Sequence, residues 1–409
     1  LEPPFTFAER PIHAVNPKVS PEFEAVIMRC LSYDPKERFA NAKELKEALA
    51  YIQQGSAAAA TAQMAGAPTA VSPSGAIAPA AGEAAAVESA VQPIWVFKCE
   101  DEIRQKAAVS DGIVLVGAYD NNLYAINAKN GEFIWKYPAT DSVGGSIPFV
   151  YEENVYIGSA DKNLYSIQLR NGHLNWKFAA GGPIFSSPVV RFDHVFFGSD
   201  DGFFYAINVN HGRSAWKTNT YGAIRSTPFV DEEYLYVGTE GGYMYSMELA
   251  SGKTKWHSQA KRSITSSPVV QDEIVFVGSM DATVYAFDAT SGYVIWRFRT
   301  RRPIISSPCI YKDTVYIGSS DGNLYAIDME SGRQLWVFET EGQVNSSPAT
   351  WDDAVYFGST DGNVYCLGLK RGNLRWQFNT GSPIIASPVI VDSVVYIGST
   401  NHNLYALPA

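Results

Sequence analysis

Residue types that could do chemistry occur throughout this 409-residue sequence, but not at the spacings that catalysis or metal binding needs. The four cysteines lie far apart and include no C-x-x-C pair: Cys30, Cys99, Cys309 and Cys366. Neither a disulfide framework nor a zinc site is therefore expected. The six histidines are scattered over expected turns and outer strands without a partner acid. We expect no catalytic residue, no bound cofactor and no metal site in these 409 residues.

Aspartates recur at one place in successive segments of the sequence. They stand in D-G or D-x-N contexts, at Asp161, Asp201, Asp281, Asp321 and Asp361. An aspartate at such a place accepts hydrogen bonds within its own turn. A catalytic aspartate should be an exception to a repeat, and none stands out, so these residues are interpreted as turn formers.

Cations gather in two expected loops where the comparable loops are neutral. The segments A-K-R-S-I (260–264) and T-R-R-P-I (300–304) contrast with T-G-S-P-I (380–384). Arg225 and Arg104 each replace a small or apolar residue of the pattern. If these loops share one face, their cations could hold a small anionic ligand, an acidic peptide or a protein; the alternative is a solvated charged rim. The candidate partner-binding residues are Lys261, Arg262, Arg301, Arg302 and Arg225.

The elements that must position these residues follow from an internal repeat. Eight tryptophans recur with one step of 41 residues and the rest of 40: Trp95, Trp135, Trp176, Trp216, Trp256, Trp296, Trp336 and Trp376. One unit reads P-I-I-S-S-P-C-I, T-V-Y-I-G-S, S-D-G-N-L-Y-A-I-D and S-G-R-Q-L-W-V-F between residues 303 and 338. Each piece is a short run of β-formers bounded by turn residues, which predicts a four-stranded meander. A period near 40 with four strands is typical of a propeller blade.

The number of blades follows from the two ends of the repeat. Eight first, second and third strands are expected between residues 105 and 407, but only seven outer strands follow them. The eighth outer strand is P-I-W-V-F-K at 93–98, ahead of all the others. It must complete the last blade, which removes the open sheet edge. The fold class predicted is mainly β: a closed eight-bladed propeller of four-stranded blades.

Most of the units carry A-x-[DN]-x-x-x-G-x-x-x-W or a close variant, as at Ala326, Asp328, Gly332 and Trp336. This resembles the tryptophan-docking repeat of pyrroloquinoline-quinone (PQQ)-type propellers, over residues 93–409. The resemblance implies that each tryptophan packs between its own blade and a neighbour, as a structural residue. Quinoprotein dehydrogenases share the repeat, and in them the cofactor lies over two adjacent cysteines beside calcium and a catalytic aspartate. This sequence has no adjacent cysteine pair, so we expect no PQQ.

The first 54 residues predict helices rather than strands. Ser20 is expected to cap a helix over 20–31, with Pro21 at its first position. A second helix is expected from Asn41, with Glu44 completing a capping box, to Gly55. Two short helices cannot build a core alone, so they are interpreted as the end of a larger domain.

The segment C-L-S-Y-D-P-K-E-R-F (30–39) resembles the end of the kinase domain in bacterial eukaryotic-like serine/threonine kinases. The resemblance implies that Arg38 is a structural residue that pairs with a buried glutamate, and that ATP and magnesium bind upstream. No Gly-rich loop, H-R-D or D-F-G occurs here, so we expect no catalysis from this fragment, whose parent protein would be the kinase.

Three parts are therefore expected. Residues 1–54 are the truncated kinase-like helices, 55–92 an Ala/Pro-rich linker with sixteen alanines, and 93–409 the propeller. A net charge of −10 argues against nucleic acid, and no run of 18 apolar residues occurs that could span a membrane. With no membrane helix in the linker, both domains are expected in the cytoplasm.

Three functions remain open. The first is a ligand- or protein-binding propeller that serves as sensor or docking module of a kinase. The second is a non-enzymatic scaffold similar to the propeller lipoprotein of outer-membrane assembly, which shares the repeat. The third is a quinoprotein dehydrogenase, against which the cysteine pattern argues.

Overall fold

The structure is a computed structural model that describes residues 20–30, 39, 44–46, 48–49 and 91–409. The chain divides into two compact units, Leu1–Ala84 and Ala85–Ala409. No helix in the described ranges is long and apolar enough to cross a membrane.

The described part of the first unit contains helix α2 (Pro21–Cys30). The backbone N–H of Phe23 donates to Ser20 Oγ over 3.2 Å, which confirms the predicted N-cap. Arg29 forms an ion pair with Glu44 at 2.8 Å and lies over the ring of Phe39. Arg38, the predicted cap Asn41 and residues 50–90, which include most of the predicted linker, lie outside the described residues.

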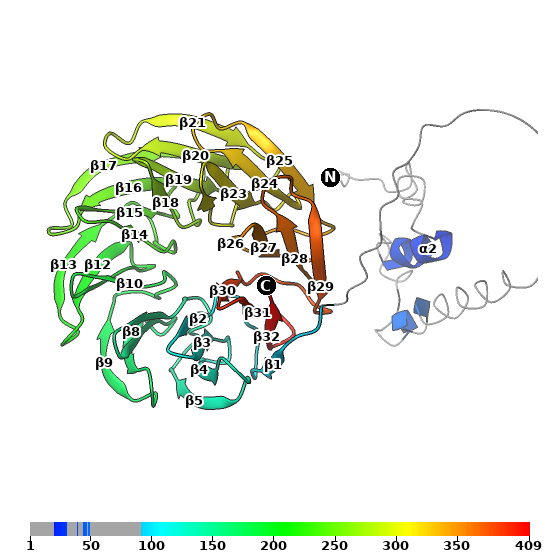
Figure 1. The fold of residues 1–409 in the computed structure, drawn as a ribbon, viewed down its shortest axis with the longest axis horizontal. Helices are drawn as coiled ribbons and strands as arrows, with labels where there is room; N and C mark the ends of the chain where they lie inside the picture. Colours follow the sequence, from blue (N-terminus) through cyan, green and yellow to red (C-terminus); the bar gives the residue numbers. More distant parts are fainter. Residues whose placement is uncertain (1–19, 31–38, 40–43, 47, 50–90) are drawn as a thin grey trace, which may run out of the picture. The chain divides into compact units, whose positions relative to one another are not determined.

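The second unit is a ring of eight four-stranded antiparallel sheets (Figure 1). The innermost strands are β2 (Ala108–Ser110), β6 (Phe149–Tyr151), β10 (Val189–Arg191), β14 (Phe229–Val230), β18 (Val269–Gln271), β22 (Cys309–Tyr311), β26 (Ala349–Trp351) and β30 (Val389–Val391). The second strands are β3 (Ile113–Gly117), β7 (Asn154–Gly158), β11 (His194–Gly198), β15 (Tyr234–Gly238), β19 (Ile274–Ser279), β23 (Thr314–Gly318), β27 (Ala354–Gly358) and β31 (Val394–Gly398). The fold class predicted from the repeat is confirmed.

The other half of each sheet faces the periphery of the ring (Figure 1). The third strands are β4 (Asn122–Asn127), β8 (Asn163–Gln168), β12 (Phe203–Asn208), β16 (Tyr243–Glu248), β20 (Thr283–Asp288), β24 (Asn323–Asp328), β28 (Asn363–Gly368) and β32 (Asn403–Pro408). The outer strands are β5 (Phe133–Pro138), β9 (Leu174–Ala179), β13 (Ser214–Asn219), β17 (Thr254–Gln259), β21 (Val294–Arg299), β25 (Gln334–Glu339), β29 (Leu374–Asn379) and β1 (Trp95–Lys98). We number the blades 1 to 8 from β2–β5 to the blade of β30–β32 and β1.

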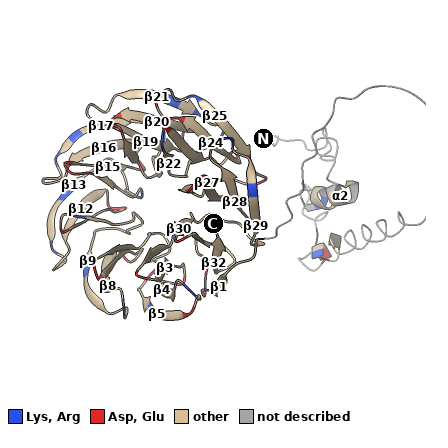
Figure 2. Ribbon diagram, in the orientation of Figure 1, with Lys and Arg blue, Asp and Glu red and all other residues tan. Residues whose placement is uncertain are grey.

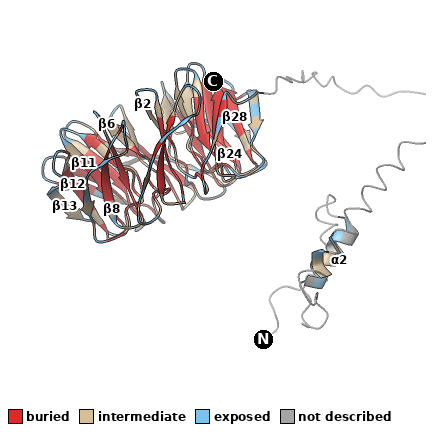
Figure 3. Cartoon of the chain, turned by 90° about the horizontal axis from the view of Figure 1, so that it is seen from below, coloured by how far each residue is buried: buried red, intermediate tan, exposed pale blue. Residues whose placement is uncertain are grey.

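The core lies between neighbouring blades, so the middle strands are buried on both faces (Figure 3). In β23, Val315 and Ile317 pack against blade 5, whereas Tyr316 packs against blade 7. A strand buried on both sides is apolar at every position, which explains runs such as T-V-Y-I-G. Outer strands alternate between exposed and partly buried residues because only one face is covered.

Tryptophan docking joins each blade to the next. Trp336 lies opposite Ala326 in the register of β24 and β25, and its ring contacts Gly372 of blade 7, which has a φ of 64°. A Cβ on Gly372 would lie 2.5 Å from that ring, so only glycine fits. Seven indole Nε1–H groups donate to a carbonyl of the next blade at 2.8–3.2 Å: Trp95 to Ala128, Trp135 to Leu169, Trp176 to Val209, Trp216 to Leu249, Trp256 to Ala289, Trp296 to Met329 and Trp336 to Leu369.

The ring closes through pairing of the two ends of the propeller. Strand β1 pairs antiparallel with β32, with Trp95 opposite Ala406 and Lys98 opposite Asn403. Trp95 is thus paired with the third strand of blade 8 in the way that Trp336 is paired with the third strand of blade 6. Its indole Nε1–H donates to the carbonyl of Ala128 in blade 1. The predicted closure of the last blade by residues 93–98 is confirmed, with the strand itself at Trp95–Lys98.

Candidate ligand-binding funnel on the propeller axis

The loops around the funnel are held by the repeated aspartates. In blade 2, Asp161 Oδ1 accepts the backbone N–H of Asn163 at 2.9 Å. Asp161 Oδ2 accepts the hydroxyl of Tyr165 at 2.6 Å and the backbone N–H of Thr140, in the loop from the previous blade, at 3.1 Å. Burial of the Asp161 carboxylate opposes its ionisation, but the hydrogen bonds, that from Tyr165 first, outweigh it and lower the pKa. Asp161 is a turn former that also anchors the loop, as the repeat predicts.

Blade 4 departs from this arrangement because Gly241 stands at the aspartate position. The hydroxyl of Tyr245 itself accepts the loop N–H of Tyr221 at 3.0 Å. The residue just before, Glu240, lines the axial cavity.

A funnel of about 850 Å³ lies on the axis of the ring. Its wall is built by the connections that lead from each outer strand to the next inner strand, together with hairpins between second and third strands. One circle of the lining, the mouth ring, consists of Arg104, Gly145, Phe185, Arg225, Thr265, Ile305, Asn345 and Ile385. A second circle, the hydroxyl belt, lies two residues further along each chain segment and contributes Ser187, Thr227, Ser267, Ser307, Ser347 and Ser387, with Ile147 at its place in blade 2.

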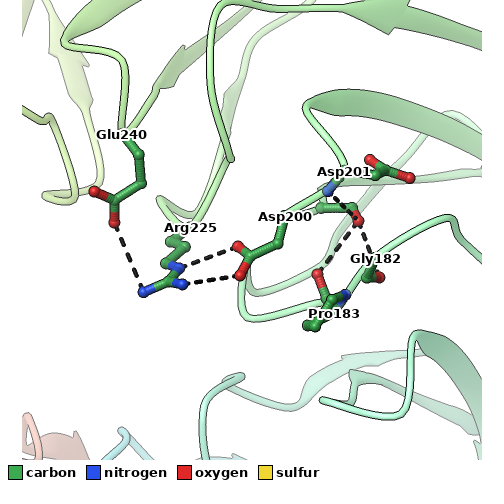
Figure 4. Close-up of polar contacts among 7 residues, drawn as sticks. Gly182, Pro183, Asp200, Asp201, Arg225 and Glu240 are labelled. Carbon is green, nitrogen blue, oxygen red and sulfur yellow. Dashed lines mark hydrogen bonds and ion pairs between the residues drawn. The ribbon is translucent and has the colours of Figure 1, made fainter.

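Arg225 is the most heavily partnered cation of the mouth ring (Figure 4). Its guanidinium binds Asp200 through two hydrogen bonds, of 3.0 and 2.9 Å, and lies 3.8 Å from Glu240. It also lies over the ring of Phe185, 5.1 Å from the centroid. The hydrogen bond to Asp200, above all, raises the pKa of Arg225. Two hairpins thus supply carboxylates to one arginine, which is positioned but largely neutralised.

Arg104 is held in a similar way on another side of the mouth. It binds Glu102 at 2.6 Å and lies over the ring of Tyr119 at 5.0 Å. The hydrogen bond to Glu102 raises the pKa of the Arg104 guanidinium.

The remaining rim cations have no such partners. Arg262 lines the funnel and is exposed, and no carboxylate of the described chain lies within ion-pair distance of its guanidinium. Lys261, Arg301 and Arg302 are equally exposed and unpaired within that part, but they lie on the neighbouring loops outside the funnel lining. Backbone N–H groups of Lys261 and Arg301 donate to Asp281 and Asp321, at 3.0 and 2.9 Å, so the loops are fixed while the side chains stay available.

Other cations of the propeller serve the blades themselves. Figure 2 shows Lys and Arg on the peripheral strands β13, β17 and β21. Lys217, Lys255 and Arg297 of these strands each cover an aromatic ring, at 4.5, 3.6 and 5.5 Å. They stabilise single blades by cation–π contact and are not candidates for ligand binding.

The hydroxyl belt is tied together by hydrogen bonds between neighbouring blades. In each link the backbone N–H of one belt residue donates to the side-chain oxygen of the next, over 2.8–2.9 Å. The links run from Ile147 to Ser187, Thr227 to Ser267, Ser267 to Ser307, Ser307 to Ser347 and Ser347 to Ser387. In blade 1 the belt position is occupied by Lys106, which cannot accept such a bond.

Lys106 is an unpartnered cation at the axis. Its side chain is partly buried and makes no hydrogen bond or ion pair with any described residue. Burial lowers the pKa of the Lys106 amine, and a smaller electrostatic contribution from Cys309 raises it. Lys106 follows Gln105, which lines the funnel, and takes the place in blade 1 that serines and threonines take in six of the other blades.

The structure thus brings Arg225 and Arg262, of the five predicted partner-binding residues, into one funnel together with Arg104. Sequence reasoning missed Lys106 and the belt. The signal was present, because Lys106 interrupts a position that is Ser or Thr in six of the other seven units.

Comparison with curated protein sequences gave no significant match. Among solved structures, BamB from Moraxella catarrhalis is 17% identical, with a TM-score of 0.68 over 78% of this chain and 100% of that one. The computationally designed protein Ika8 is 15% identical, with a TM-score of 0.69 and the same coverage. Quinohemoprotein alcohol dehydrogenase from Comamonas testosteroni is 15% identical, with a TM-score of 0.68 over 78% of this chain and 76% of that one. At these identities the likeness shows the fold alone.

The sequence also matches the family described as outer membrane protein assembly factor BamB, over residues 80–190, 179–265 and 248–409. Together these segments span most of the chain, including every blade. The chain therefore belongs to the family of BamB-type propellers built from PQQ-like repeats.

Proposed function

We propose that the propeller is a non-catalytic binding module that takes an anionic ligand in its axial funnel and serves as the sensor or docking part of a serine/threonine protein kinase. The observation that carries the proposal is the funnel itself, whose mouth holds Arg104, Arg225 and Arg262. Arg262 has no carboxylate partner within the described residues and can neutralise a ligand charge. Cations on one concave wall of an acidic protein favour an anionic ligand.

The kinase part of the proposal is supported by the sequence of residues 1–54. The capped helix α2 and the ion pair between Arg29 and Glu44 are consistent with a packed helical domain. The proposal places ATP and magnesium in a kinase core encoded before Leu1, and the whole protein in the cytoplasm. The coding sequence upstream of Leu1 should then contain a Gly-rich loop, H-R-D and D-F-G.

The experiment compares charge variants in the protein encoded by the complete gene. Arg262→Glu combined with Arg301→Glu should change autophosphorylation or substrate choice, because both charges lie at the proposed binding rim. Arg333→Glu is the matched control, since Arg333 is exposed on the turn before the outer strand β25, at the opposite face of the ring. Equal phosphorylation by both variants and the parent protein would contradict the sensor function.

A second candidate is a protein-binding scaffold without any kinase. It is supported by the family match and by the structural likeness to BamB from Moraxella catarrhalis. An upstream coding sequence without kinase motifs would favour this candidate.

We propose no quinone cofactor in the funnel, and its donor set supports this. Glu240 is the one carboxylate among the residues lining the funnel, and it lies beside Arg225. Cys99, Cys309 and Cys366 are all free thiols in the described chain. The wall therefore offers neither the paired cysteines of the quinoproteins nor a carboxylate set suited to calcium.

A further inference from the structure

The hydroxyl belt of the funnel differs in chemistry from the mouth ring. The mouth presents guanidinium groups, two of which already bind carboxylates. The belt presents hydroxyl groups, and its position in blade 1 holds an amine, that of Lys106, which has no partner in the described chain. An unpaired cation in a partly buried place lowers the stability of the folded chain.

The hydrogen bonds of the belt determine which way its hydroxyl groups can act. Ser307, Ser347 and Ser387 each accept a backbone N–H at Oγ, at 2.8–2.9 Å. None of these three hydroxyls donates to a described residue, so each O–H remains available as a donor. Because the three residues line the funnel, their protons can turn into it. This arc of the belt therefore offers hydrogen-bond donors to a ligand, and donors favour an anion.

Lys106 lies next to this arc. It occupies the belt position of blade 1, and Ser387, Ser347 and Ser307 occupy those of blades 8, 7 and 6 in order. The three serines line the funnel, as does Gln105, the residue before Lys106. One ammonium group and three hydroxyl donors thus belong to four successive blades of the same belt.

We propose that this region, formed by Lys106, Ser307, Ser347 and Ser387, binds the phosphate group of a small phosphorylated molecule whose remainder lies in the wider funnel. A phosphate has enough oxygens to accept from several hydroxyls and an ammonium at once, whereas a planar carboxylate would suit a bidentate arginine. The funnel, at about 850 Å³, has room for a ligand larger than phosphate itself. The inference rests on the proposed binding function and names the class of ligand.

The test measures binding of inorganic phosphate and of glucose 6-phosphate to the 409-residue chain by isothermal titration calorimetry and ³¹P NMR line broadening. Glucose and acetate are the neutral and carboxylate comparisons. We expect inorganic phosphate and glucose 6-phosphate to bind, and glucose 6-phosphate to bind more tightly than inorganic phosphate. Glucose and acetate should bind more weakly than either phosphate. Lys106→Ser, which introduces the residue the belt carries elsewhere, should weaken phosphate binding at least tenfold, and Lys106→Arg should weaken it less because the charge remains.

Matched variants keep the result interpretable. Lys129→Ser removes an exposed lysine at the opposite face and should leave binding unchanged. Ser347→Ala removes one donor and should weaken binding severalfold. Unaltered phosphate affinity in Lys106→Ser, or acetate bound as well as phosphate, would overturn the inference. Loss of phosphate binding in Arg262→Ser but not in Lys106→Ser would move the site to the mouth, which refutes the inference and leaves the proposed function standing.

Discussion

At the residue scale, the funnel is defined by how each cation is partnered. Arg225 is fixed between Asp200 and Glu240, and its charge is offset there. Lys106 has no counterpart of this kind within the described residues. A group that destabilises the folded state is typical of a functional position, because the free energy of ligand binding can offset the stability that it costs.

Lys106 should make stability depend on pH in a definite direction. Its folded-state pKa is lowered by burial, from an unfolded value near 10.5. Between those two values the unfolded chain holds more protons than the folded chain, so the free energy of unfolding rises with pH. We expect Lys106→Ser to unfold at a higher temperature than the parent at pH 7, with the difference shrinking as the pH approaches about 10.

Thermal melts of the two proteins from pH 6 to 10, in buffer without phosphate, measure this. The Lys129→Ser control should follow the parent at every pH. A melting temperature that falls in Lys106→Ser would show that the amine stabilises the fold instead.

At the element scale, the two interactions that recur from blade to blade are tryptophan docking and the aspartate–tyrosine contact. Docking joins a blade to its successor through packing on a glycine turn and an indole hydrogen bond. The aspartate–tyrosine contact joins a hairpin to the loop from the previous blade. Together they fix the wall of the funnel from opposite faces of the ring.

Trp135→Ala should destabilise the propeller by about 3–5 kcal/mol, as expected for a buried tryptophan that leaves a cavity. Trp135 is 7% exposed and donates to Leu169 across the blade boundary. Trp351, which falls outside the repeat and is 39% exposed, is the matched control, and its change to alanine should cost about 0.5 kcal/mol or less. Urea denaturation followed by circular dichroism measures both, and equal costs would refute the docking role.

Tyr165→Phe should cost about 1–2 kcal/mol at pH 7, because it removes a hydrogen bond to a charged carboxylate. The lowered pKa of Asp161 means that this stabilisation is present above about pH 3.8 and is lost as the pH falls through the folded-state pKa. Tyr151→Phe, whose hydroxyl makes only a long 3.5 Å contact with Asp193, should cost much less. Denaturation at pH 7 and at successively lower pH tests both points, and a penalty that does not decline on acidification below pH 3.8 would contradict the carboxylate's role.

At the scale of the whole molecule, closure decides whether the ring has an open edge. Strand β1 supplies the outer strand of the last blade and the tryptophan that docks onto blade 1. The funnel depends on closure too, because its lining combines Arg104 of blade 1 with Ser387 of blade 8.

Deletion of residues 93–98 should lower the melting temperature and promote aggregation, since it exposes the edge of β32. Differential scanning calorimetry and light scattering measure the two effects. Deletion of residues 20–30, which belong to the other unit, is the control and should leave the melt of the propeller unchanged. An unaltered melt after removal of 93–98 would mean that closure does not hold the ring together.

The architecture of the propeller could be predicted from its amino-acid sequence. Each blade is a meander whose hydrogen bonds join neighbouring segments, so turn residues and β-formers within one 40-residue unit predict its four strands. Counting strands predicted closure, because an unpaired edge is unfavourable. The docking role of the tryptophans was implied by the resemblance to PQQ-type propellers.

The composition of the funnel, in contrast, depends on how the eight blades pack around the axis. Eight loops separated by about 40 residues each meet on one axis, and the radius and direction of every side chain there depend on the closed ring. Arg225 and Arg262 line the cavity while Lys261, Arg301 and Arg302 do not, although all five come from equivalent loops. The ion pairs of Arg225 with Asp200 and Glu240 join residues of different loops that local periodicity cannot relate. Such contacts arise only when all eight blades are packed together, and this is why the repeat predicts the fold but leaves the binding site undetermined.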